Sequence, residues 1–371
     1  MKFSVKKGDI LDVLSKVQGI AGRRSNLAIT TNVLIRTVED GIQIAATDLE
    51  TGFEGTYSAD IESEGSITIN ARKLYEIVRE FPEDTIVVHE KDNRWIRIGN
   101  KSVEYHLLGM NTEDFPEIPQ IEGVVFLEMA SSDLKRMIEK SLMIGVSDDK
   151  RAHITGVFFE KVETETGKII RMVSTDGSRL CKVDHAFDTD FDLPEEAALI
   201  IPKKGLHEVA KFLDIDGDVG IGFKDSHFVI KRDYETIIIR LLEGDFPKYA
   251  DVIKKGEAKA VKLKKQPFLN TLKRMSILSS ENYKGVIFSY SPDKLVITST
   301  NPDIGESKEE MAIDYDGDSM EVAFNPRYFI ETINVIDGDG VLLHLKDSEK
   351  PCLIEGDDED SFLSVVMPMR I

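Results

Sequence analysis

Two hydrophobic patterns alternate along the chain and predict its secondary structure. Short runs in which apolar and polar residues alternate, such as DGIQIAATD (40–48) and DKLVITST (293–300), are typical of half-buried antiparallel strands. Longer stretches with apolar residues three and four positions apart predict helices over 6–24, 71–81, 131–143, 202–213, 262–276 and 325–336. Helices beside antiparallel strands predict an α+β fold.

One pattern of predicted strands and helices occurs three times along the sequence. The segments 67–88, 198–223 and 320–345 each read as an apolar strand, a helix, a Gly/Asp-rich or Pro-containing turn and another strand. Ala71, Pro202 and Pro326 fall in the first helical turn, where the missing N–H of a proline has no effect. A second helix opens each unit, so every unit is predicted to hold two helices.

Other short elements recur in the same register. AATDLE (45–50), VSTDGSRL (173–180) and TSTNPD (298–303) each follow an apolar strand, and their threonines lie 128 and 125 residues apart. Two DFP loops are 131 residues apart. Self-similarity at a fixed period indicates tandem repeats. We therefore predict three tandem repeats of a two-helix plus antiparallel-sheet domain, over residues 1–124, 125–253 and 254–371.

Charge is distributed unevenly between the predicted helices and the rest. The formal net charge is -20 and the pI is near 4.9, values that by themselves argue against a nucleic-acid partner. The six helices nevertheless hold 20 Lys/Arg against 8 Asp/Glu. In one helix such a bias describes an ordinary solvated face. In six helices it predicts a basic surface that contacts the phosphates of duplex DNA without reading sequence.

Several classes of protein are excluded by what the sequence lacks. No run approaches the roughly 18 apolar residues of a membrane span, so we expect no membrane partner. The start MKFSVKKGDI has no secretory pattern, and only Cys181 and Cys352 could form a disulfide, which together favour a reducing cytoplasm.

Catalytic and metal-binding motifs are also missing. There is no H-E-x-x-H, G-x-x-x-x-G-K-[ST] or G-x-S-x-G pattern. The segment 214–225 begins like a calcium loop, but it lacks glycine at the sixth position and ends in Asp225. No base is identifiable for Ser178 as a nucleophile. The sequence thus predicts a non-enzymatic protein with no metal and no cofactor.

The three repeats, the ATDLE and STDGSRL turns, the DFP loops and the final VVMPMRI (365–371) resemble the β subunits of bacterial DNA polymerase III, the sliding clamps. The resemblance covers residues 1–371. It implies a head-to-tail homodimeric ring whose helices line the hole, and a processivity function without catalysis. The implied partners are encircled double-stranded DNA, the polymerase III α subunit, the clamp loader, and other polymerases and mismatch-repair proteins that bind through short linear motifs.

The resemblance also implies three sets of site residues. The DNA-facing set is Arg24, Arg72, Lys73, Lys150, Arg151, Lys203 and Lys204. The partner-peptide pocket is Ile154, Thr175, Gly177, Ser178, Arg179, Leu180, Pro247, Val252, Asn325, Tyr328, Val365, Val366, Met367, Pro368, Met369 and Arg370. The dimer interface is Tyr105, Leu107, Ile277 and Leu278. Ala152 and His153 stand where relatives often carry aromatic DNA contacts, and Asp251 where some carry a basic residue.

Simpler interpretations stay open for parts of these sets. Val365 and Val366 fit a last core strand, and Lys203 and Lys204 fit an exposed helix start. The interface side chains could instead be buried within their own domains. Two other functions also remain. One is an acidic hydrolase whose repeated Asp turns, at Asp176 or Asp216, bind metal, and the other is an interaction scaffold that never meets DNA.

Overall fold

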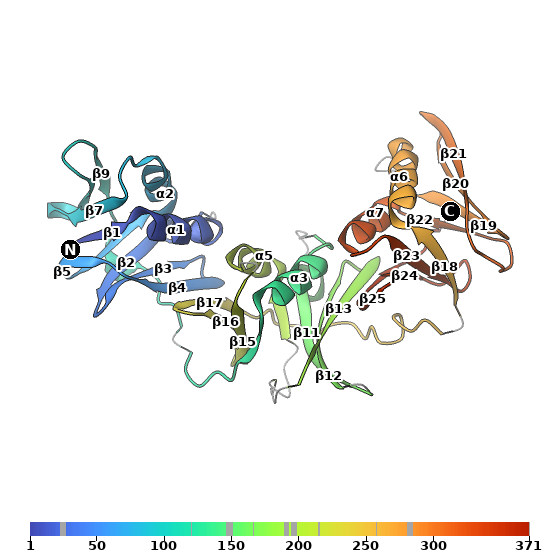
Figure 1. Cartoon of the computed structure of the whole chain (residues 1–371), viewed down its shortest axis with the longest axis horizontal. Coiled ribbons are helices and arrows are strands. Elements are labelled where there is room, and N and C mark those ends of the chain that lie inside the picture. The colour runs from blue at the N-terminus through green and yellow to red at the C-terminus, as the bar shows by residue number, and fades with distance from the viewer. Residues whose placement is uncertain are drawn as a thin grey trace. The chain divides into compact units, whose positions relative to one another are not determined.

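The computed structural model describes residues 1–22, 27–119, 121–145, 151–165, 167–188, 193, 199–213, 216–256, 258–279 and 285–370 (Figure 1). Its α-helices are α1 (Lys7–Ala21), α2 (Ala71–Glu80), α3 (Ser131–Ser141), α4 (Ala152–Thr155), α5 (Lys203–Phe212), α6 (Lys265–Met275) and α7 (Pro326–Val335). All six predicted helices are present, and α4 is an additional single turn. None of the helices in these ranges is long and apolar enough to cross a membrane.

The chain forms two compact units, and each is described by itself. The first unit holds residues 1–135 and 204–241. The second unit holds residues 136–188, 199–203 and 242–370. All described strand pairs in both units are antiparallel, as the alternating patterns predict.

Two sheets make up the strands of the first unit. The five-stranded sheet has the order β5-β1-β7-β8-β9, with bounds Asp60–Ser63, Lys2–Lys6, Thr85–Glu90, Trp95–Gly99 and Glu104–Leu108. The eight-stranded sheet has the order β10-β15-β16-β17-β4-β3-β2-β6. Its bounds are Leu127–Ala130, Asp218–Lys224, His227–Arg232, Glu235–Arg240, Thr51–Tyr57, Gly41–Thr47, Asn32–Val38 and Ser66–Asn70.

The second unit repeats this plan. Its eight-stranded sheet has the order β14-β11-β12-β13-β25-β24-β23-β18, with bounds Leu199–Pro202, Gly156–Thr164, Gly167–Thr175, Arg179–Phe187, Glu359–Val366, Cys352–Gly356, Gly340–Leu345 and Lys259–Lys264. A four-stranded sheet has the order β21-β20-β19-β22, with bounds Gly305–Ala312, Lys294–Asn301, Val286–Ser291 and Met320–Phe324.

Each eight-stranded sheet joins strands from two of the predicted repeats. In the first unit β17 pairs with β4, with Ile237 opposite Phe53. In the second unit β25 pairs with β13, with Val365 opposite Leu180. The strands of the middle repeat are therefore divided between the two units. The internal repeat is confirmed in the strand order, while the domain boundaries at 124/125 and 253/254 stay a prediction.

Helix pairs cover the sheets within each unit, as Figure 1 shows for α1 with α2 and for α6 with α7. The apolar face of α1 is fully buried through Ile10, Leu14 and Val17. Phe268 of α6 meets Phe329 of α7 edge-on, with 6.4 Å between ring centroids. Burying an apolar side chain of this size contributes roughly 1.5–3 kcal/mol. The period of 3.6 residues seen in the sequence thus corresponds to a real core face.

Helix starts follow ordinary capping chemistry, with two differences from the expected bounds. The side chain of Asn70 accepts a hydrogen bond from the Lys73 N–H at 3.0 Å, and Pro326 stands in the first turn of α7. Pro202 instead ends β14, opposite Gly156, and α5 begins one residue later. Residues 262–264 belong to β18 because KAVKLK alternates apolar and polar side chains, a strand pattern.

Candidate functional site

Two cations of the expected DNA-facing set are exposed on α2. The side chains of Arg72 and Lys73 are 77% and 61% exposed, and both contact the Glu76 carboxylate, at 3.0 and 2.8 Å. Hydrogen bonds from Lys73 and then Arg72 lower the pKa of Glu76. Such exposed pairs contribute little to stability, so a phosphate can replace the carboxylate at small expense.

Lys203 differs from its neighbour Lys204. Lys204 is exposed, whereas Lys203 is fully buried and its ammonium donates to the Thr175 carbonyl at 3.5 Å. Burial lowers the pKa of Lys203 to about 8. A side chain in the first helical turn points back toward the preceding segment, which places this one against the end of β12. The burial does not fit the solvent-exposed helix start expected from the sequence.

The other DNA-facing predictions are only partly described. Arg151 is exposed at the start of α4, while Arg24 and Lys150 lie outside the described residues. His153 is half-buried, and the side chain at position 152 is likewise outside the description.

Some helix cations are engaged in buried ion pairs. Lys140 of α3, whose side chain is 4% exposed, contacts both Asp337 and Glu359. Lys16 of α1 lies 2.7 Å from Asp12 and 3.5 Å from Glu235. The number of basic residues counted on the predicted helices is therefore larger than the number of positive charges that a partner such as DNA can contact.

The turn between β12 and β13 is organised by Asp176. Its carboxylate accepts the backbone N–H of Ser178 and of Arg179, at 3.0 and 3.1 Å. The Thr175 hydroxyl donates to the Arg179 carbonyl at 2.7 Å and accepts the Gly177 N–H at 3.1 Å. Gly177 has a φ of 89°, a conformation that glycine adopts without strain. The predicted pocket residues in this turn are thus fixed in position by hydrogen bonds.

The first repeat builds the same turn. The carboxylate of Asp48 accepts the N–H of Glu50 and of Thr51, at 3.1 and 2.7 Å. The Leu49 N–H donates to Thr47 Oγ1 at 3.0 Å, and Leu49 has a φ of 79° in the place of Gly177. In the third repeat Asn301 accepts the Asp303 N–H at 3.1 Å. The recurring Asp or Asn is therefore explained by backbone capping.

The C-terminal segment pairs with this turn. Val365 and Val366 are buried in β25, as expected of a last core strand. Beyond it, the Met367 N–H donates to the Ser178 carbonyl at 3.0 Å and the Met369 N–H to the Ala323 carbonyl at 2.8 Å. The side chains of these methionines are 41% and 37% exposed. Two adaptable apolar side chains are thus presented beside the turn.

Arg179 links the turn to α7. Its guanidinium lies 4.3 Å from the centroid of the Tyr328 ring and forms ion pairs with Asp176 and Glu331. Arg327 also contacts Glu331, at 2.7 Å. Because the Arg179 side chain is 7% exposed, these partners keep a nearly buried cation paired. Asn325 accepts the Arg327 N–H at 3.1 Å and so starts α7.

The remaining predicted pocket residues vary in exposure. Ile154 is buried in α4, which packs against β11, β12 and β14. Leu180 is buried in the cluster that includes Val365. Pro247 is exposed, and Val252 is 38% exposed. Pro368 is half-buried and Arg370 exposed. The structure brings together the turn, Tyr328 and the C-terminal segment, all within the second unit.

Sequence reasoning missed two groups of residues here. Glu331 holds Arg179 in place, and its only sequence signal is the Arg327–Glu331 spacing of four residues. Lysines at 254, 255, 346 and 350 line one hollow with Val252 and Met367. No signal in the sequence joins these lysines, because they come from segments about a hundred residues apart.

Exposed apolar side chains lie on one sheet end and in the turn after α6. β9 is the last strand of the five-stranded sheet, and Tyr105 and Leu108 on it are 40% and 61% exposed. Ile277, just after α6, is 74% exposed. Leu107 and Leu278 are half-buried. The alternative that these interface residues are buried within their own domains fails for Tyr105 and Ile277.

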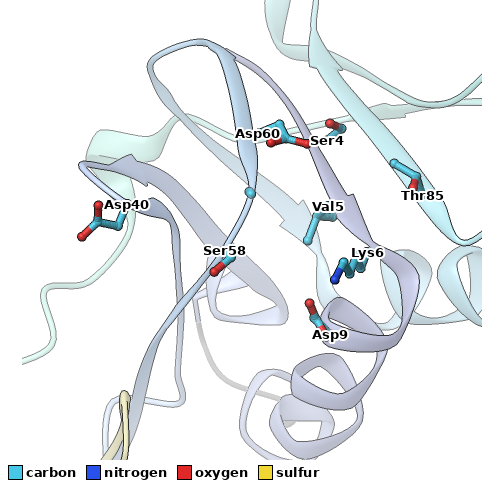
Figure 2. A pocket seen from close by; sticks show the side chains of 9 residues that line it. Ser4, Val5, Lys6, Asp9, Asp40, Ser58, Asp60 and Thr85 are labelled. Carbon is cyan, nitrogen blue, oxygen red and sulfur yellow. The ribbon is translucent and has the colours of Figure 1, made fainter.

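A polar hollow of about 380 Å³ lies in the first unit (Figure 2). Lys6 and Asp9 face it from the end of β1 and the start of α1, and Asp40 lies apart from them in this view.

Across the described ranges, no group of three or more His, Cys, Asp or Glu is placed to hold a metal. Asp176 itself is committed to the turn, so the geometry offers no support for a metal-dependent hydrolase.

The chain matches known proteins along its length. Models described as the N-terminal, central and C-terminal domains of the DNA polymerase III beta subunit match residues 1–119, 128–248 and 250–370. A beta sliding clamp of Pseudomonas putida is 31% identical over 375 residues, with 100% of both chains covered. That of Chlamydia pneumoniae is 28% identical over 371 residues, covering 100% of this chain and 99% of the relative.

Solved structures agree with these matches. The DNA polymerase sliding clamp of Pseudomonas aeruginosa with ligand has 29% identity and a TM-score of 0.91, with 100% of both chains covered. The sliding clamp of Bartonella birtlesii bound to griselimycin has 28% identity and a TM-score of 0.92, again with 100% of both chains covered.

Replacing Lys203 with methionine is expected to raise the free energy of unfolding at pH 7 by about 2 kcal/mol, because the buried cation is removed at similar volume. The folded-state pKa of about 8 lies below the unfolded value of roughly 10.4. Between these values the unfolded chain binds more protons, so the stability of the parent protein rises with pH. Urea unfolding at several pH values should show that the variant lacks this rise.

Lys204→Met is the matched control, since its side chain is exposed. A Lys203→Met protein that is less stable than the parent at pH 7 would contradict a buried, destabilising ammonium.

Replacing Asp176 with alanine is expected to lower the free energy of unfolding by about 2–3 kcal/mol. The change removes two backbone caps and one partner of the nearly buried Arg179. Thermal unfolding measures it, and Asp48→Ala is the control that removes the caps alone. Unchanged stability together with loss of a metal-dependent nuclease activity would instead support the hydrolase.

Proposed function

The chain belongs to the family of DNA polymerase III beta subunits, and from this premise we propose how its surfaces carry out the work of a sliding clamp. Its function is that of a non-catalytic clamp that encircles duplex DNA and tethers the replicative polymerase. It has the clamp fold of three tandem domains. The proposals concern which residues form the ring joint, the DNA-facing surface and the peptide pocket.

The proposed ring joint is inferred from the five-stranded and four-stranded sheets, which we call the incomplete sheets because each lacks, among the described strands, the inter-repeat pairing of the eight-stranded sheets. By position in the repeat, β9 corresponds to β17 and β25, and β21 corresponds to β4 and β13. Inside the chain β17 pairs with β4 and β25 pairs with β13. In the described ranges β9 and β21 end their sheets. We therefore expect β9 of one copy to pair with β21 of a second copy, which closes a head-to-tail homodimer.

Exposed apolar side chains support this joint. Tyr105 and Leu107 lie on β9, and Ile277 and Leu278 lie in the 3-10 turn Ser276–Leu278 that follows α6. Pairing would cover the 74% exposed Ile277 and would satisfy the backbone groups along both strands. Ring closure then depends on apolar burial and backbone hydrogen bonds together.

The DNA-facing surface is proposed from the exposed helix cations. Arg72, Lys73, Arg151 and Lys204 are exposed, and Arg24 and Lys150 join them by resemblance alone. Lys203 is left out of this surface, because its ammonium is buried. Contacts with backbone phosphates carry no sequence information, so the ring can move along the duplex. A topological hold makes tight contacts unnecessary.

The pocket around the Thr175–Leu180 turn is proposed to bind short linear peptides. Relatives from Bartonella birtlesii and Pseudomonas aeruginosa have been solved bound to griselimycin, which supports a ligand site in the fold. Met367 and Met369 can repack around different apolar side chains. The partners we propose are the polymerase III α subunit, the clamp loader, other polymerases and mismatch-repair proteins.

The cellular location is proposed to be the cytoplasm, where DNA replication occurs in bacteria. Cys181 and Cys352 are free and buried, as suits a reducing compartment. Burial raises the pKa of the Cys181 thiol, which keeps it in the unreactive form.

Topological retention is the test of the ring. The protein, loaded by its clamp loader with ATP on nicked circular DNA, is expected to stay bound through a high-salt wash and to dissociate after one restriction cut. Gel filtration of the complex before and after cutting measures this retention. Protein that stays on the linear DNA and leaves only when salt is raised would show an electrostatic hold and would contradict encirclement.

Changing Tyr105 or Ile277 to glutamate is expected to weaken the dimer by about a hundredfold or more, because each change buries a charge in the joint. Sedimentation equilibrium measures the dissociation constant. Val125→Glu is the control, since Val125 is 61% exposed and lies outside both incomplete sheets. Dimers of unchanged affinity in both variants would place the joint elsewhere.

A further inference from the structure

A hollow of about 530 Å³ in the second unit extends the proposed peptide pocket. It lies between residues 251–256 and the loop 346–351 that joins β23 to β24. Val252 and Met367, both residues of the peptide pocket, line it as well. We call it the lysine hollow, because its lining includes Lys254, Lys255, Lys346 and Lys350.

The lysine hollow adjoins the apolar part of the proposed pocket, because Val252 and Met367 belong to both. Leu353 lines the hollow and lies opposite Val365 in the β24–β25 pair. Both belong to one buried cluster with Leu180. Val252 and Met367 are 38% and 41% exposed, so their side chains are accessible at the boundary. A peptide anchored beside Met367 would therefore lie at the edge of the hollow.

Charge distinguishes the hollow from the rest of the chain. Four lysines line it against two carboxylates, Asp251 and Glu349, in a protein whose net charge is -20. Lys254 lies 2.8 Å from Asp251, but the two side chains are 70% and 91% exposed, and such pairs exchange partners readily. Within the lining itself, ammonium groups outnumber carboxylates, which favours an anionic ligand.

The lysines differ in how strongly they are held. Lys255 lies 2.7 Å from Glu355, whose side chain is 8% exposed and which also contacts His344 at 2.8 Å. Burial would raise the pKa of Glu355, yet the hydrogen bonds from His344 and Lys255 outweigh it and lower that pKa. Lys255 thus stabilises the fold rather than being available to a ligand, because removing it would leave the buried Glu355 carboxylate with less compensating positive charge.

Lys346 and Lys350 are the cations available to a ligand. Both are exposed, and neither has a carboxylate partner within the part of the chain that the structure describes. The carboxylate of Asp347 accepts the N–H of Glu349 and of Lys350, each at 2.9 Å, which fixes the loop between them. Asp347 and Glu349 reduce the local positive charge but occupy neither ammonium.

We propose that the lysine hollow binds an acidic segment flanking the apolar anchor of a partner peptide, with Lys346 and Lys350 as its specificity-determining contacts. The proposal rests on the peptide pocket proposed above and adds a chemical preference to it. Partners with aspartate or glutamate beside the anchor are then bound more tightly than partners with neutral flanks. The anchor supplies apolar burial and the flank supplies selection.

Labelled synthetic peptides test the preference. All carry one apolar anchor of leucine and phenylalanine, and they differ in having an acidic run on its amino side, an acidic run on its carboxyl side, or serines on both. Fluorescence anisotropy with the full chain should show one acidic peptide binding about tenfold more tightly than the serine peptide at low salt. Raising the salt should reduce that advantage.

Double substitutions test whether Lys346 and Lys350 cause the tighter binding of the acidic peptide. Lys346→Glu/Lys350→Glu should remove the acidic advantage while the serine peptide binds as before, and Lys346→Gln/Lys350→Gln should remove most of it. Lys224→Glu/Lys231→Glu makes the same change in net charge at two exposed lysines of the first unit and should keep the advantage. Circular dichroism confirms that each variant is folded.

The outcomes separate this proposal from the peptide pocket itself. Griselimycin is expected to displace the serine peptide. If it does, equal affinity for the acidic and serine peptides would contradict the proposed acidic preference but not the pocket. Tighter binding of the acidic peptide that persists in both loop variants would contradict it in the same way. Failure of the serine peptide to bind, or of griselimycin to displace it, would overturn the pocket and with it the inference.

Discussion

Antiparallel pairing between strands of neighbouring repeats is the interaction on which the remaining structure depends. An unpaired strand edge exposes backbone donors and acceptors, and pairing between repeats satisfies one such edge in each eight-stranded sheet. β17 meets β4 in the first unit, and β25 meets β13 in the second. The latter pair brings the C-terminal segment to the Asp176 turn. The proposed pocket therefore lies where two repeats share one sheet.

The helices and strands were predictable from the sequence because each has its own hydrophobic period. The three-fold repeat was also visible, since turn residues that cap the backbone recur at the same register. Errors fell at boundaries, such as 262–264, where an alternating strand runs directly into a helix. There the two periods overlap, and only the pairing of β18 with β23 decides between them.

Burial of individual cations was not predictable. Lys203 and Lys204 are adjacent in sequence and identical in type, yet one is buried and the other exposed. The difference arises from the direction in which each side chain leaves the first turn of α5. Lys140 is paired with carboxylates about 200 residues away. Composition alone cannot report such long-range pairs, and the same is true of the lysines contributed by the 251–256 and 346–351 segments.

Sharing of sheets between repeats also restricts how a protein of this kind can change its size over evolution. A loop such as 346–351 can lengthen or shorten without unpairing a strand, because it ends no sheet. Deleting one strand from within a sheet, in contrast, would leave its neighbour without a backbone partner and expose an unpaired strand edge. Gain or loss of chain length in the sheets is therefore expected in steps of a whole repeat, so that duplication, rather than gradual extension, is the accessible route to a larger or smaller relative.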